Sequence, residues 1–446
     1  MAAVSPARKA AFHILLAVER GQSHSDDLLR GKGVSALSAA DRNLTTTLVL
    51  GVLRWQLHLD AALQALLARP NAKLDAEVRI ALRMGAFQLL HLDRIPARAA
   101  IDESVELAKQ AGHRFASGMV NAVLRKLAAS PLSALNENAT EQAALEAHPA
   151  WMVERWTSFY GEESARAICR HGQSQPALCV RLARADVEDE LVSAGINLEP
   201  GALLTAARAV VSGDVTATAA LREGRARMQD EGSQLAAEMA GRGSAILDCC
   251  AAPGGKTMIL AERNPQARIV ACETSPQRFE QLRQRLAPLG ARVECRQADA
   301  TTLADESAFD SALADVPCSG TGTLGRNPEI RRRLRLEDLA RQAERQRAIL
   351  AATLRAVRPG GRVVYSTCSL EPEENEHVVA SVLTQMPDVR VAPAEDRISS
   401  LLNEGVLVAA GAKRLRGCIT PEGFLHLLPG AFQTDGFFIA VLEKTG

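Results

Sequence analysis

Two cysteines in the last third of the chain are candidates for covalent chemistry. Cys318 closes the stretch Asp-Val-Pro-Cys at residues 315–318, and Cys368 lies between a threonine and a serine. A thiolate is a strong nucleophile, although a single cysteine at the end of a strand is more often buried and inert. Two cysteines after successive predicted strands, with Asp315 three residues before one of them, favour a reactive pair. The Gly, Ser and Thr residues beside both would keep the backbone open to a substrate.

A glycine-rich turn earlier in the chain is a candidate site for a nucleoside-containing cofactor. Residues 247–257 follow an apolar run and open a predicted helix, and paired glycines let a ligand approach the backbone closely. The spacing differs from that of a P-loop and from G-x-G-x-x-G, which disfavours both. Glu273 and Asp299 follow the next two predicted strands, and a carboxylate at the first position can hold a ribose diol. Any one of these elements alone would be better explained as an ordinary turn or a solvated carboxylate, but three in register favour a cofactor site. The candidate cofactor-binding residues are Cys250, Ala251, Ala252, Pro253, Gly254, Gly255, Lys256, Glu273, Asp299 and Asp315.

A sheet is needed to bring these residues together. From residue 244 onward, short apolar runs alternate with amphipathic helices, which predicts a parallel sheet with helices on both faces. Ligands of such sheets bind at the carboxyl ends of the strands. The predicted strands are Ala245–Cys249, Arg268–Cys272, Arg292–Cys295, Ser311–Ala314, Arg362–Ser366 and Gly436–Leu442, with helices such as Pro276–Leu286 and Leu336–Val357 between them.

The N-terminal part has a different texture. Apolar spacing of three and four over residues 5–129 predicts an all-helical bundle of about six or seven helices. Ser5 before Pro6, Ser38 with Asp41, and Asp75 are predicted helix starts, and Gly51 is expected to bend or break the long stretch 44–67. Residues 130–148 are expected to form a linker with a short helix. A small α/β subdomain should follow, with strands at 177–182 and 209–211. The expected domains are 1–130, 131–243 and 244–446.

Charge and cysteine content limit the function classes. The chain has 446 residues with 52 Lys and Arg against 52 Asp and Glu, so net charge gives no hint of a nucleic-acid partner. Residues 325–358, however, contain 10 Arg against 4 acidic residues. This cluster favours phosphate binding, with a solvated helix face as the alternative. Its members nearest the Cys318 loop are Arg326, Arg331, Arg332, Arg333 and Arg335.

The nine cysteines form no C-x-x-C pair, so a zinc ribbon or another metal site is not expected. Reduced thiols in a cytoplasmic protein fit this pattern better than a disulfide framework. No apolar run reaches the length of about 18 residues that a membrane span needs. We expect a monomer with no membrane partner.

The segments around residues 250, 318 and 368 resemble those of the Sun/RsmB-type RNA 5-methylcytosine methyltransferases of bacteria. The most specific part is the pairing of Pro317-Cys318 with Thr367-Cys368-Ser369. Residues 5–129 are similar to the helical RNA-binding domain of the antitermination factor NusB. The match departs from the family only slightly, with Glu273 and Glu329 where Asp is also common. Further similar motifs are His148-Pro149-Ala150-Trp151, Gln229-Asp230-Glu231-Gly232-Ser233-Gln234, Arg326-Asn327-Pro328-Glu329 and Asp435-Gly436-Phe437-Phe438.

This resemblance implies a multidomain fold and an enzymatic activity. The fold would be an N-terminal all-α NusB-like bundle, a small α/β linker subdomain and a C-terminal α/β Rossmann-like methyltransferase that uses S-adenosylmethionine. By resemblance, Cys368 adds to carbon 6 of cytosine, Cys318 assists elimination, and Asp315 contacts the base near N3. Residues 250–256 would wrap the amino-acid and ribose part of the cofactor, Glu273 would take the ribose hydroxyls, and Asp299 would lie near the adenine. The NusB-like extension implies small-subunit (16S) ribosomal RNA as the substrate.

Several alternatives stay open. DNA cytosine methyltransferases use the cysteine of a Pro-Cys motif as the nucleophile, which would point to Cys318. Transfer RNA is the main alternative substrate. A non-catalytic RNA-binding or antitermination factor is a different class of function, although the intact cysteines and glycine-rich turn argue against it. An amino-group methyltransferase is disfavoured because residues 315–318 supply no aromatic side chain.

Overall fold

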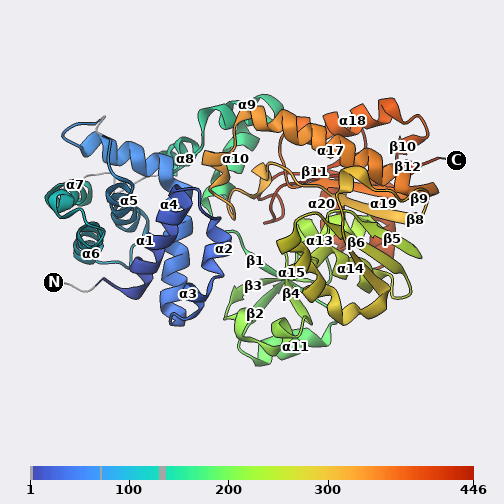
Figure 1. The fold of residues 1–446 in the computed structure, drawn as a ribbon, viewed down its shortest axis with the longest axis horizontal. Coiled ribbons are helices and arrows are strands. Elements are labelled where there is room, and N and C mark those ends of the chain that lie inside the picture. The colour runs from blue at the N-terminus through green and yellow to red at the C-terminus, as the bar shows by residue number, and fades with distance from the viewer. Residues whose placement is uncertain (1–3, 71–72, 130–136, 446) are drawn as a thin grey trace. The chain divides into compact units, whose positions relative to one another are not determined.

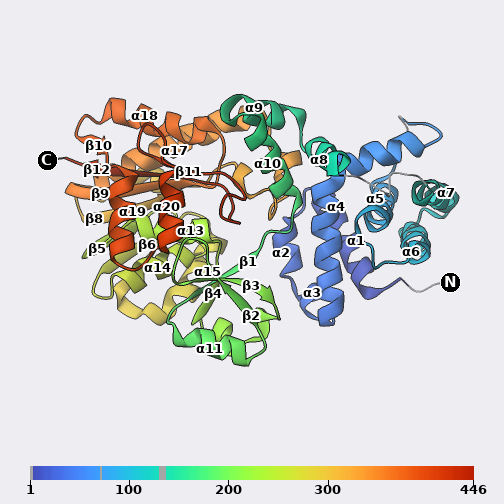
Figure 2. The ribbon, with the colours of Figure 1, turned by 180° about the vertical axis from the view of Figure 1, so that it is seen from behind.

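The chain forms two compact units. The computed structural model describes residues 4–70, 73–129 and 137–445. The first unit comprises residues 1–175 with 324–333, and the second comprises residues 176–323 and 334–446. Figure 1 and Figure 2 show their helices and strands from two opposite sides. The short segment Leu324–Arg333 therefore packs with the first unit, although its neighbours in the sequence belong to the second.

The described residues of the first unit form helices joined by turns and loops, with no strand among them. The sequence prediction of a helical bundle is thus confirmed. Its apolar core is built mainly from the long helix α4 (Ala39–Leu66) and the three helices that pack on it. The helices are α1 (Pro6–Glu19), α2 (Ser25–Leu29), α3 (Lys32–Ser35), α4 (Ala39–Leu66), α5 (Ala76–His91), α6 (Ala97–Gln110), η1 (Arg114–Ala116), α7 (Ser117–Ala128), α8 (Glu137–Glu146), α9 (Ala150–Tyr160), α10 (Glu162–Gln173) and α16 (Ile330–Arg333). The predicted linker at 130–148 contains α8, and its first residues, 130–136, lie outside the described part of the chain.

The predicted helix starts differ in how they are capped. The Ser38 hydroxyl accepts from the backbone N–H of Asp41 at 3.1 Å, which confirms this N-cap. Asp75 precedes α5 but makes no side-chain cap bond. The Ser5 side chain does not cap α1 either, because its hydroxyl donates to the carboxylate of Glu103 at 2.8 Å. The oxygen of the same hydroxyl accepts from Nη1 of Arg8 at 3.1 Å, so a charged donor takes the place of the backbone N–H that a cap would bind.

Gly51 does not break α4, so the expectation of a break at this residue is wrong. The helix runs without interruption past Gly51 to Leu66. A Cβ built on Gly51 would lie 2.0 Å from Cζ of Phe87, a residue of α5. The ring of Phe87 is buried and stacks on His91 with 5.3 Å between ring centroids. The glycine therefore allows the close packing of α4 against α5.

This contact predicts a measurable loss of stability. The Gly51→Ala substitution should destabilise the protein by about 1–3 kcal/mol, because the added methyl overpacks the α4–α5 contact. Gly118 lies in α7, where a methyl group added to its Cα would meet no other atom within 4 Å. The control Gly118→Ala should stabilise by about 0.4–1 kcal/mol through the unfolded state. Urea unfolding followed by circular dichroism measures both changes. Equal midpoints for the two variants would contradict the overpacking argument.

The segment Leu324–Arg333 is bound tightly within the first unit. Arg331 is buried and donates to the carbonyl oxygens of Arg54 at 2.6 Å and Gly172 at 2.8 Å. The carboxylate of Glu329 accepts from the backbone N–H and the hydroxyl of Ser25. The prediction that this arginine cluster binds phosphate is thus wrong for Arg331, because its guanidinium is buried and both of its terminal nitrogens donate to protein carbonyls. Arg332 forms an ion pair with Glu19.

A small α/β subdomain opens the second unit. Its four-stranded antiparallel sheet has the order β2-β3-β1-β4. The strands are β1 (Leu178–Leu182), β2 (Asn197–Pro200), β3 (Ala207–Ser212) and β4 (Ala226–Met228), with α11 (Asp186–Ser193), η3 (Val215–Ala217) and α12 (Ala219–Arg222) between them. The predicted strands at 177–182 and 209–211 are confirmed as β1 and β3. The two unpredicted strands are short, and their residues give no clear apolar alternation.

The large sheet of the second unit has the strand order β10-β12-β9-β8-β5-β6-β7, and β11 pairs with β12. The five strands β5 to β9 are parallel, as predicted, whereas β10, β11 and β12 run antiparallel to their neighbours. The sheet is therefore mixed. The sequence does not predict this, because the apolar pattern of a strand such as residues 436–442 does not show whether the strand runs parallel or antiparallel to its neighbour. The strands are β5 (Ala245–Asp248), β6 (Arg268–Glu273), β7 (Val293–Gln297), β8 (Phe309–Asp315), β9 (Val357–Thr367), β10 (Val389–Val391), β11 (Leu425–Leu427) and β12 (Phe437–Lys444).

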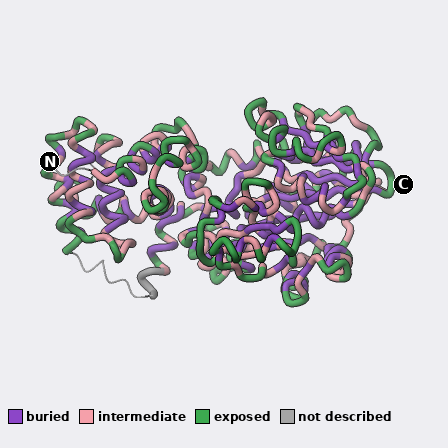
Figure 3. Tube along the Cα trace, turned by 90° about the horizontal axis from the view of Figure 1, so that it is seen from below, coloured by how far each residue is buried: buried purple, intermediate pink, exposed green. Residues whose placement is uncertain are grey.

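Helices cover both faces of this sheet. Two of them, α17 and α18, pack on one face, and α13, α14, α15, α19 and α20 pack on the other (Figure 1). The central strands are buried along most of their length (Figure 3). Such coverage of both faces is typical of α/β folds. The elements are α13 (Glu231–Met239), α14 (Gly255–Arg263), α15 (Pro276–Leu286), η4 (Ala287–Arg292), η5 (Ala300–Thr302), η6 (Thr321–Thr323), α17 (Leu336–Ala356), η7 (Pro372–Glu374), α18 (Glu376–Gln385), α19 (Ala394–Asn403) and α20 (Ala409–Arg416).

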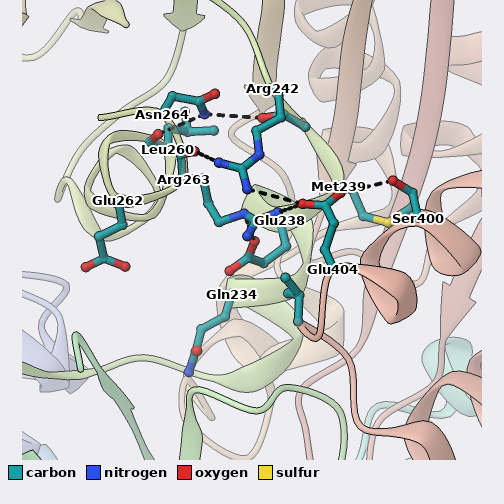
Figure 4. Close-up of polar contacts among 12 residues, drawn as sticks. Gln234, Glu238, Met239, Arg242, Leu260, Glu262, Arg263, Asn264, Ser400 and Glu404 are labelled. Carbon is teal, nitrogen blue, oxygen red and sulfur yellow. Dashed lines mark hydrogen bonds and ion pairs between the residues drawn. The ribbon is translucent and has the colours of Figure 1, made fainter. Parts of the chain in front are cut away.

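A polar cluster ties the small subdomain to the large sheet (Figure 4). Glu238 on α13 forms ion pairs with Arg181 of β1 at 2.8 Å and with Arg263 of α14 at 3.0 Å. Arg263 also pairs with Glu404, directly after α19. Both carboxylate partners of Arg181, Glu238 and Glu262, lie on helices that cover the sheet. Buried pairs of this kind fix the orientation of the elements that they join.

The described helices include none whose length and hydropathy would suit a membrane span.

Candidate active site

The functional candidates meet at the carboxyl edge of the large sheet. Strands β5, β6, β8 and β9 end at Asp248, Glu273, Asp315 and Thr367. These strands are parallel, so their ends lie along the same edge. The cysteine loops follow β8 and β9 directly. Parallel pairing of β8 with β9 sets Asp315 opposite Ser366 and brings the two loops side by side.

A cavity of about 420 Å³ opens at this edge, within the size range of small-molecule sites. Six of the predicted site residues line it: Cys250, Ala252, Glu273, Asp315, Cys318 and Cys368. The cavity wall also includes residues that the sequence analysis did not select, among them Thr274, Ser275, Arg278, Arg345 and Ile349. Lys256, Asp299 and the turn residues Ala251, Pro253, Gly254 and Gly255 do not belong to its lining.

The two cysteine sulfurs lie 3.4 Å apart, within hydrogen-bonding distance of each other. Both thiols line the cavity. The hydrogen bond to Cys368, together with burial, raises the pKa of the Cys318 thiol well above its ordinary value. Cys318 therefore holds its proton and can donate it toward the sulfur of Cys368. At this distance either thiol can donate a hydrogen bond to the other sulfur.

Lys256 and Asp315 form an ion pair beside the cysteines. Nζ of Lys256 lies 2.7 Å from Oδ2 of Asp315, and the hydroxyl of Ser366 donates to Oδ1 of Asp315 at 2.7 Å. Burial opposes the charge on Lys256, but Asp315, Cys368 and Asp248 outweigh it and raise the pKa of the ammonium. A cation is therefore kept beside Cys368 and can stabilise a thiolate there.

The glycine-rich turn joins β5 to α14. Gly254 has φ of 98°, in the left-handed region that favours glycine, and its N–H donates to the carbonyl oxygen of Ala251 at 2.7 Å. The hydroxyl of Thr257 donates to Oδ2 of Asp248 at 2.7 Å, which ties the first turn of α14 to the end of β5. Burial raises the pKa of Asp248 to about 7. The turn thus forms a fixed backbone wall behind Cys250 and Ala252.

The two acidic cofactor candidates have different surroundings. Glu273 is 5% exposed, lines the cavity and accepts from the backbone N–H of Ser275 at 2.8 Å. Asp299 instead accepts from the backbone N–H of Thr301 at 2.9 Å and so caps η5. The residues on either side of Asp299, Ala298 and Ala300, line the cavity. Glu273 is therefore the acidic group that directly faces the cavity at the end of β6.

Sequence reasoning missed the buried polar side chains that surround the cysteines. Glu374 hydrogen-bonds to Ser319 and Ser369, and Ser366 orients Asp315. The missed cavity residues Arg345 and Ile349 lie on α17, whose sequence shows only an amphipathic pattern. One available signal was the density of acidic residues directly after Cys368, at 371, 373 and 374.

Comparisons with known proteins identify the family. Residues 238–443 match the family described as 16S rRNA methyltransferase RsmB/F, and residues 5–129 match the NusB family. Residues 148–211 match the ferredoxin-like domain of RsmF/B-like methyltransferases. The "Probable ribosomal RNA small subunit methyltransferase B" of Bacillus subtilis is 32% identical over 460 residues, which covers 98% of this chain and 99% of the relative. The chain belongs to the RsmB/F family.

Other relatives and solved structures agree with this assignment. The ribosomal RNA small subunit methyltransferase B of Pseudomonas syringae is 34% identical and covers 98% of this chain and 96% of its own length. The crystal structure of PH0851 superposes with a TM-score of 0.78 at 23% identity, over 99% of this chain and all of that one. A methyltransferase homolog from Pyrococcus horikoshii gives a TM-score of 0.54 at 25% identity, over 70% of this chain and all of that one. The fold is therefore a helical NusB domain, a ferredoxin-like subdomain and a mixed-sheet methyltransferase domain.

Membership of this family makes the protein an RNA methyltransferase that uses S-adenosylmethionine, and the cavity suits that cofactor. It offers a buried carboxylate, Glu273, for hydroxyl groups, and Cys250 and Ala252 of the glycine-rich turn form part of its wall. Cys318 and Cys368 line the same cavity. Within the described residues, no cluster of three or more His, Cys, Asp or Glu side chains is suited to hold a metal ion.

Proposed function

We propose that this methyltransferase methylates carbon 5 of a cytosine in small-subunit ribosomal RNA through a covalent adduct with Cys368. The observation that carries the proposal is the 3.4 Å separation of the Cys318 and Cys368 sulfurs within one cavity. With two thiols at this distance, one can add to a base and the other can assist the release of the product. Names of relatives that include ribosomal RNA small subunit methyltransferase support the choice of RNA.

Cys368 is the proposed nucleophile. Its sulfur forms a bond to carbon 6 of cytosine, the 5,6 double bond opens, and carbon 5 becomes able to attack a methyl group. Lys256 lies close enough to lower the cost of the thiolate that this step needs. Asp315, held by Lys256 and Ser366, contacts the base near N3 and stabilises a proton there.

Cys318 is proposed to assist the second half of the reaction. The carbon 5 proton must leave while carbon 5 keeps the two electrons of the broken C–H bond. These electrons re-form the 5,6 double bond, and the carbon–sulfur bond to Cys368 then breaks. The thiol of Cys318 can give its proton to the departing sulfur of Cys368 and, as the thiolate formed in that transfer, accept the carbon 5 proton. The raised pKa of Cys318 suits a residue that starts as a neutral proton carrier.

S-adenosylmethionine supplies the methyl group as an electrophilic sulfonium when it is bound. We assign residues 250–256 and Glu273 to its amino-acid and ribose parts. Ala298 and Ala300 would line the adenine position, and Asp299 would lie near the adenine as a fixed cap of η5. Asp315 lines the same cavity as Glu273 and both cysteines, which supports a place for it between the cofactor and the base.

We propose that the steps of RNA binding and methyl transfer are distributed over three domains, at residues 1–130, 131–243 and 244–446. The NusB-like domain contributes RNA contacts, and the last domain performs the chemistry in the cytoplasm, where ribosomal RNA is assembled. Because the target base must reach a cavity in the protein, it is unpaired or flipped out of its helix. Transfer RNA is the second candidate substrate, and only the shared methyltransferase fold supports it.

Methylation of defined RNAs tests this proposal. The purified protein with S-adenosylmethionine should introduce 5-methylcytosine into protein-free 16S ribosomal RNA and leave total transfer RNA unmodified. Bisulfite sequencing reads the modified position, and a deletion strain should lack the same mark. Methylation of transfer RNA alone would replace the substrate assignment, and the absence of heat on calorimetric titration with S-adenosylmethionine would favour a non-catalytic RNA-binding protein.

A further inference from the structure

One buried carboxylate bonds to the residues that directly follow both cysteines. Glu374, the last residue of η7, is fully buried. Its Oε1 accepts from the backbone N–H of Ser319 at 2.9 Å, and its Oε2 accepts from the hydroxyls of Ser319 and Ser369. The two serine hydroxyls lie 3.0 Å apart. Glu374 thus connects the loop of Cys318 to the loop of Cys368 one residue beyond each sulfur.

Two neighbours of this carboxylate extend the bridge to the other side of each cysteine. Gln346 on α17 donates both to Oε1 of Glu374 at 3.0 Å and to the carbonyl oxygen of Pro317 at 2.9 Å. Asn375 accepts from the hydroxyl of Thr367 at 2.5 Å and donates to the carbonyl oxygen of Ser369 at 3.0 Å. The residues before and after both cysteines are therefore held by one network.

The chemistry of this network explains why the central residue is acidic. Four donors converge on Glu374: the N–H and hydroxyl of Ser319, the hydroxyl of Ser369 and the amide of Gln346. Only a carboxylate offers two acceptor oxygens to such a set, because a glutamine would turn an NH₂ group toward some of the donors. In the described part of the chain, no lysine or arginine forms an ion pair with Glu374. Burying an anion among neutral donors is costly, and such groups are concentrated at functional sites.

The charge of Glu374 also acts on the sulfur of Cys318. The pKa of Cys318 is raised by its hydrogen bond to Cys368, by burial, by the charge of Cys368 and then by the charge of Glu374. Burial, followed by the charges of Cys318 and Glu374, raises the pKa of Tyr365 on β9, so its hydroxyl stays neutral. On the opposite side, the ammonium of Lys256 acts on Cys368. The anion of Glu374 near Cys318 and the cation of Lys256 near Cys368 both favour negative charge on Cys368 over negative charge on Cys318.

We propose that Glu374 is a positioning residue that holds the two sulfurs together and directs the negative charge of the pair to Cys368. Its role rests on the proposed covalent function, in which Cys368 attacks and Cys318 carries a proton. The bridge fixes the geometry, and its charge disfavours a thiolate at Cys318.

Thiol labelling without RNA tests the charge effect separately from methyl transfer. In the Glu374→Gln variant, alkylation of Cys318 by iodoacetamide should begin at lower pH, and the ratio of Cys318 to Cys368 labelling, measured by peptide mass spectrometry, should rise several-fold. The kcat for methylation should fall about 10- to 100-fold, as for a misplaced catalytic group, while the KM for S-adenosylmethionine stays unchanged. The control Glu373→Gln makes the same chemical change one residue earlier and should alter neither quantity.

Two further variants separate geometry from charge. Ser319→Ala combined with Ser369→Ala removes the hydroxyl bonds but keeps the anion, so kcat should fall while the pH dependence of Cys318 labelling is preserved. Glu374→Asp keeps the charge on a shorter side chain and should likewise preserve the labelling, even if Glu374→Gln fails to fold. A labelling ratio that changes as much in Glu374→Asp as in Glu374→Gln, or in neither, would overturn the proposal. A labelling shift in an enzyme that methylates no RNA would refute the proposed function and leave the charge effect standing.

Discussion

Replacing Cys368 with alanine should abolish methyl transfer and remove the covalent RNA adduct. Without this sulfur, the group that we propose to add to carbon 6 is lost, so carbon 5 stays a poor nucleophile. We expect the rate to fall on the order of 10⁴-fold or more, as when other enzymes lose a covalent nucleophile. Transfer of a radioactive methyl group to 16S ribosomal RNA measures the rate. Denaturing gels with RNA that carries fluorine at carbon 5 of the target cytosine, where no proton can leave, measure the adduct.

The matched control for this experiment is another cysteine of the same sheet. Cys295 lies on β7, is partly buried and does not line the cavity. The Cys295→Ala variant should keep both the activity and the adduct. Binding of S-adenosylmethionine by Cys368→Ala, measured by calorimetry, should show that the cavity persists. An adduct that survives in Cys368→Ala would show that Cys368 is not the nucleophile.

The Cys318→Ala variant should accumulate the adduct instead of losing it. The nucleophile Cys368 remains, so addition and methylation proceed once on each enzyme molecule. Release then slows by about 10²–10⁴-fold, the usual contribution of a positioned acid or base. On denaturing gels, a slowly migrating protein–RNA species should appear with unmodified RNA, whereas the unaltered enzyme shows little of it. A single burst of methyl transfer, equal to the enzyme concentration, is the kinetic sign.

These two variants together distinguish the two assignments of the nucleophile. If Cys318 were the nucleophile, the adduct would accumulate in Cys368→Ala and vanish in Cys318→Ala. The electrostatic surroundings argue against that outcome, since burial and the neighbouring groups raise the pKa of Cys318. The cation of the pair, Lys256, acts on Cys368.

The position of the site could be predicted because it depends on local patterns. Each apolar run before Asp248, Glu273, Asp315 and Thr367 has a length typical of a strand, and parallel strands end at one edge. The meeting of Cys318 and Cys368 follows from that rule together with the family resemblance. The predicted helix Pro276–Leu286 has the same bounds in the structure, since Ser275 and Pro276 mark its start unambiguously.

Features that depend on contacts between distant residues could not be predicted. Glu374 meets Ser319 across 55 positions, and nothing in a run of acidic residues shows that one of them points inward. The pairing of β12 against β9 reverses the direction of one edge of the sheet, although its apolar pattern resembles that of a parallel strand. Arg331 has the sequence surroundings of a solvated cluster, yet it donates to two buried carbonyls.

The two outer strands of the large sheet bear on the solubility of the protein. An open sheet exposes unpaired backbone groups at its borders, and these groups can recruit a strand from another molecule. Here one border, β10, is only three residues long. The other border, β7, carries Glu294 and Arg296 in an ion pair at 2.6 Å, and Arg268 adds a second pair to Glu294. Short length at one border and fixed charges at the other discourage aggregation by strand addition, so the sheet can remain open without a covering partner.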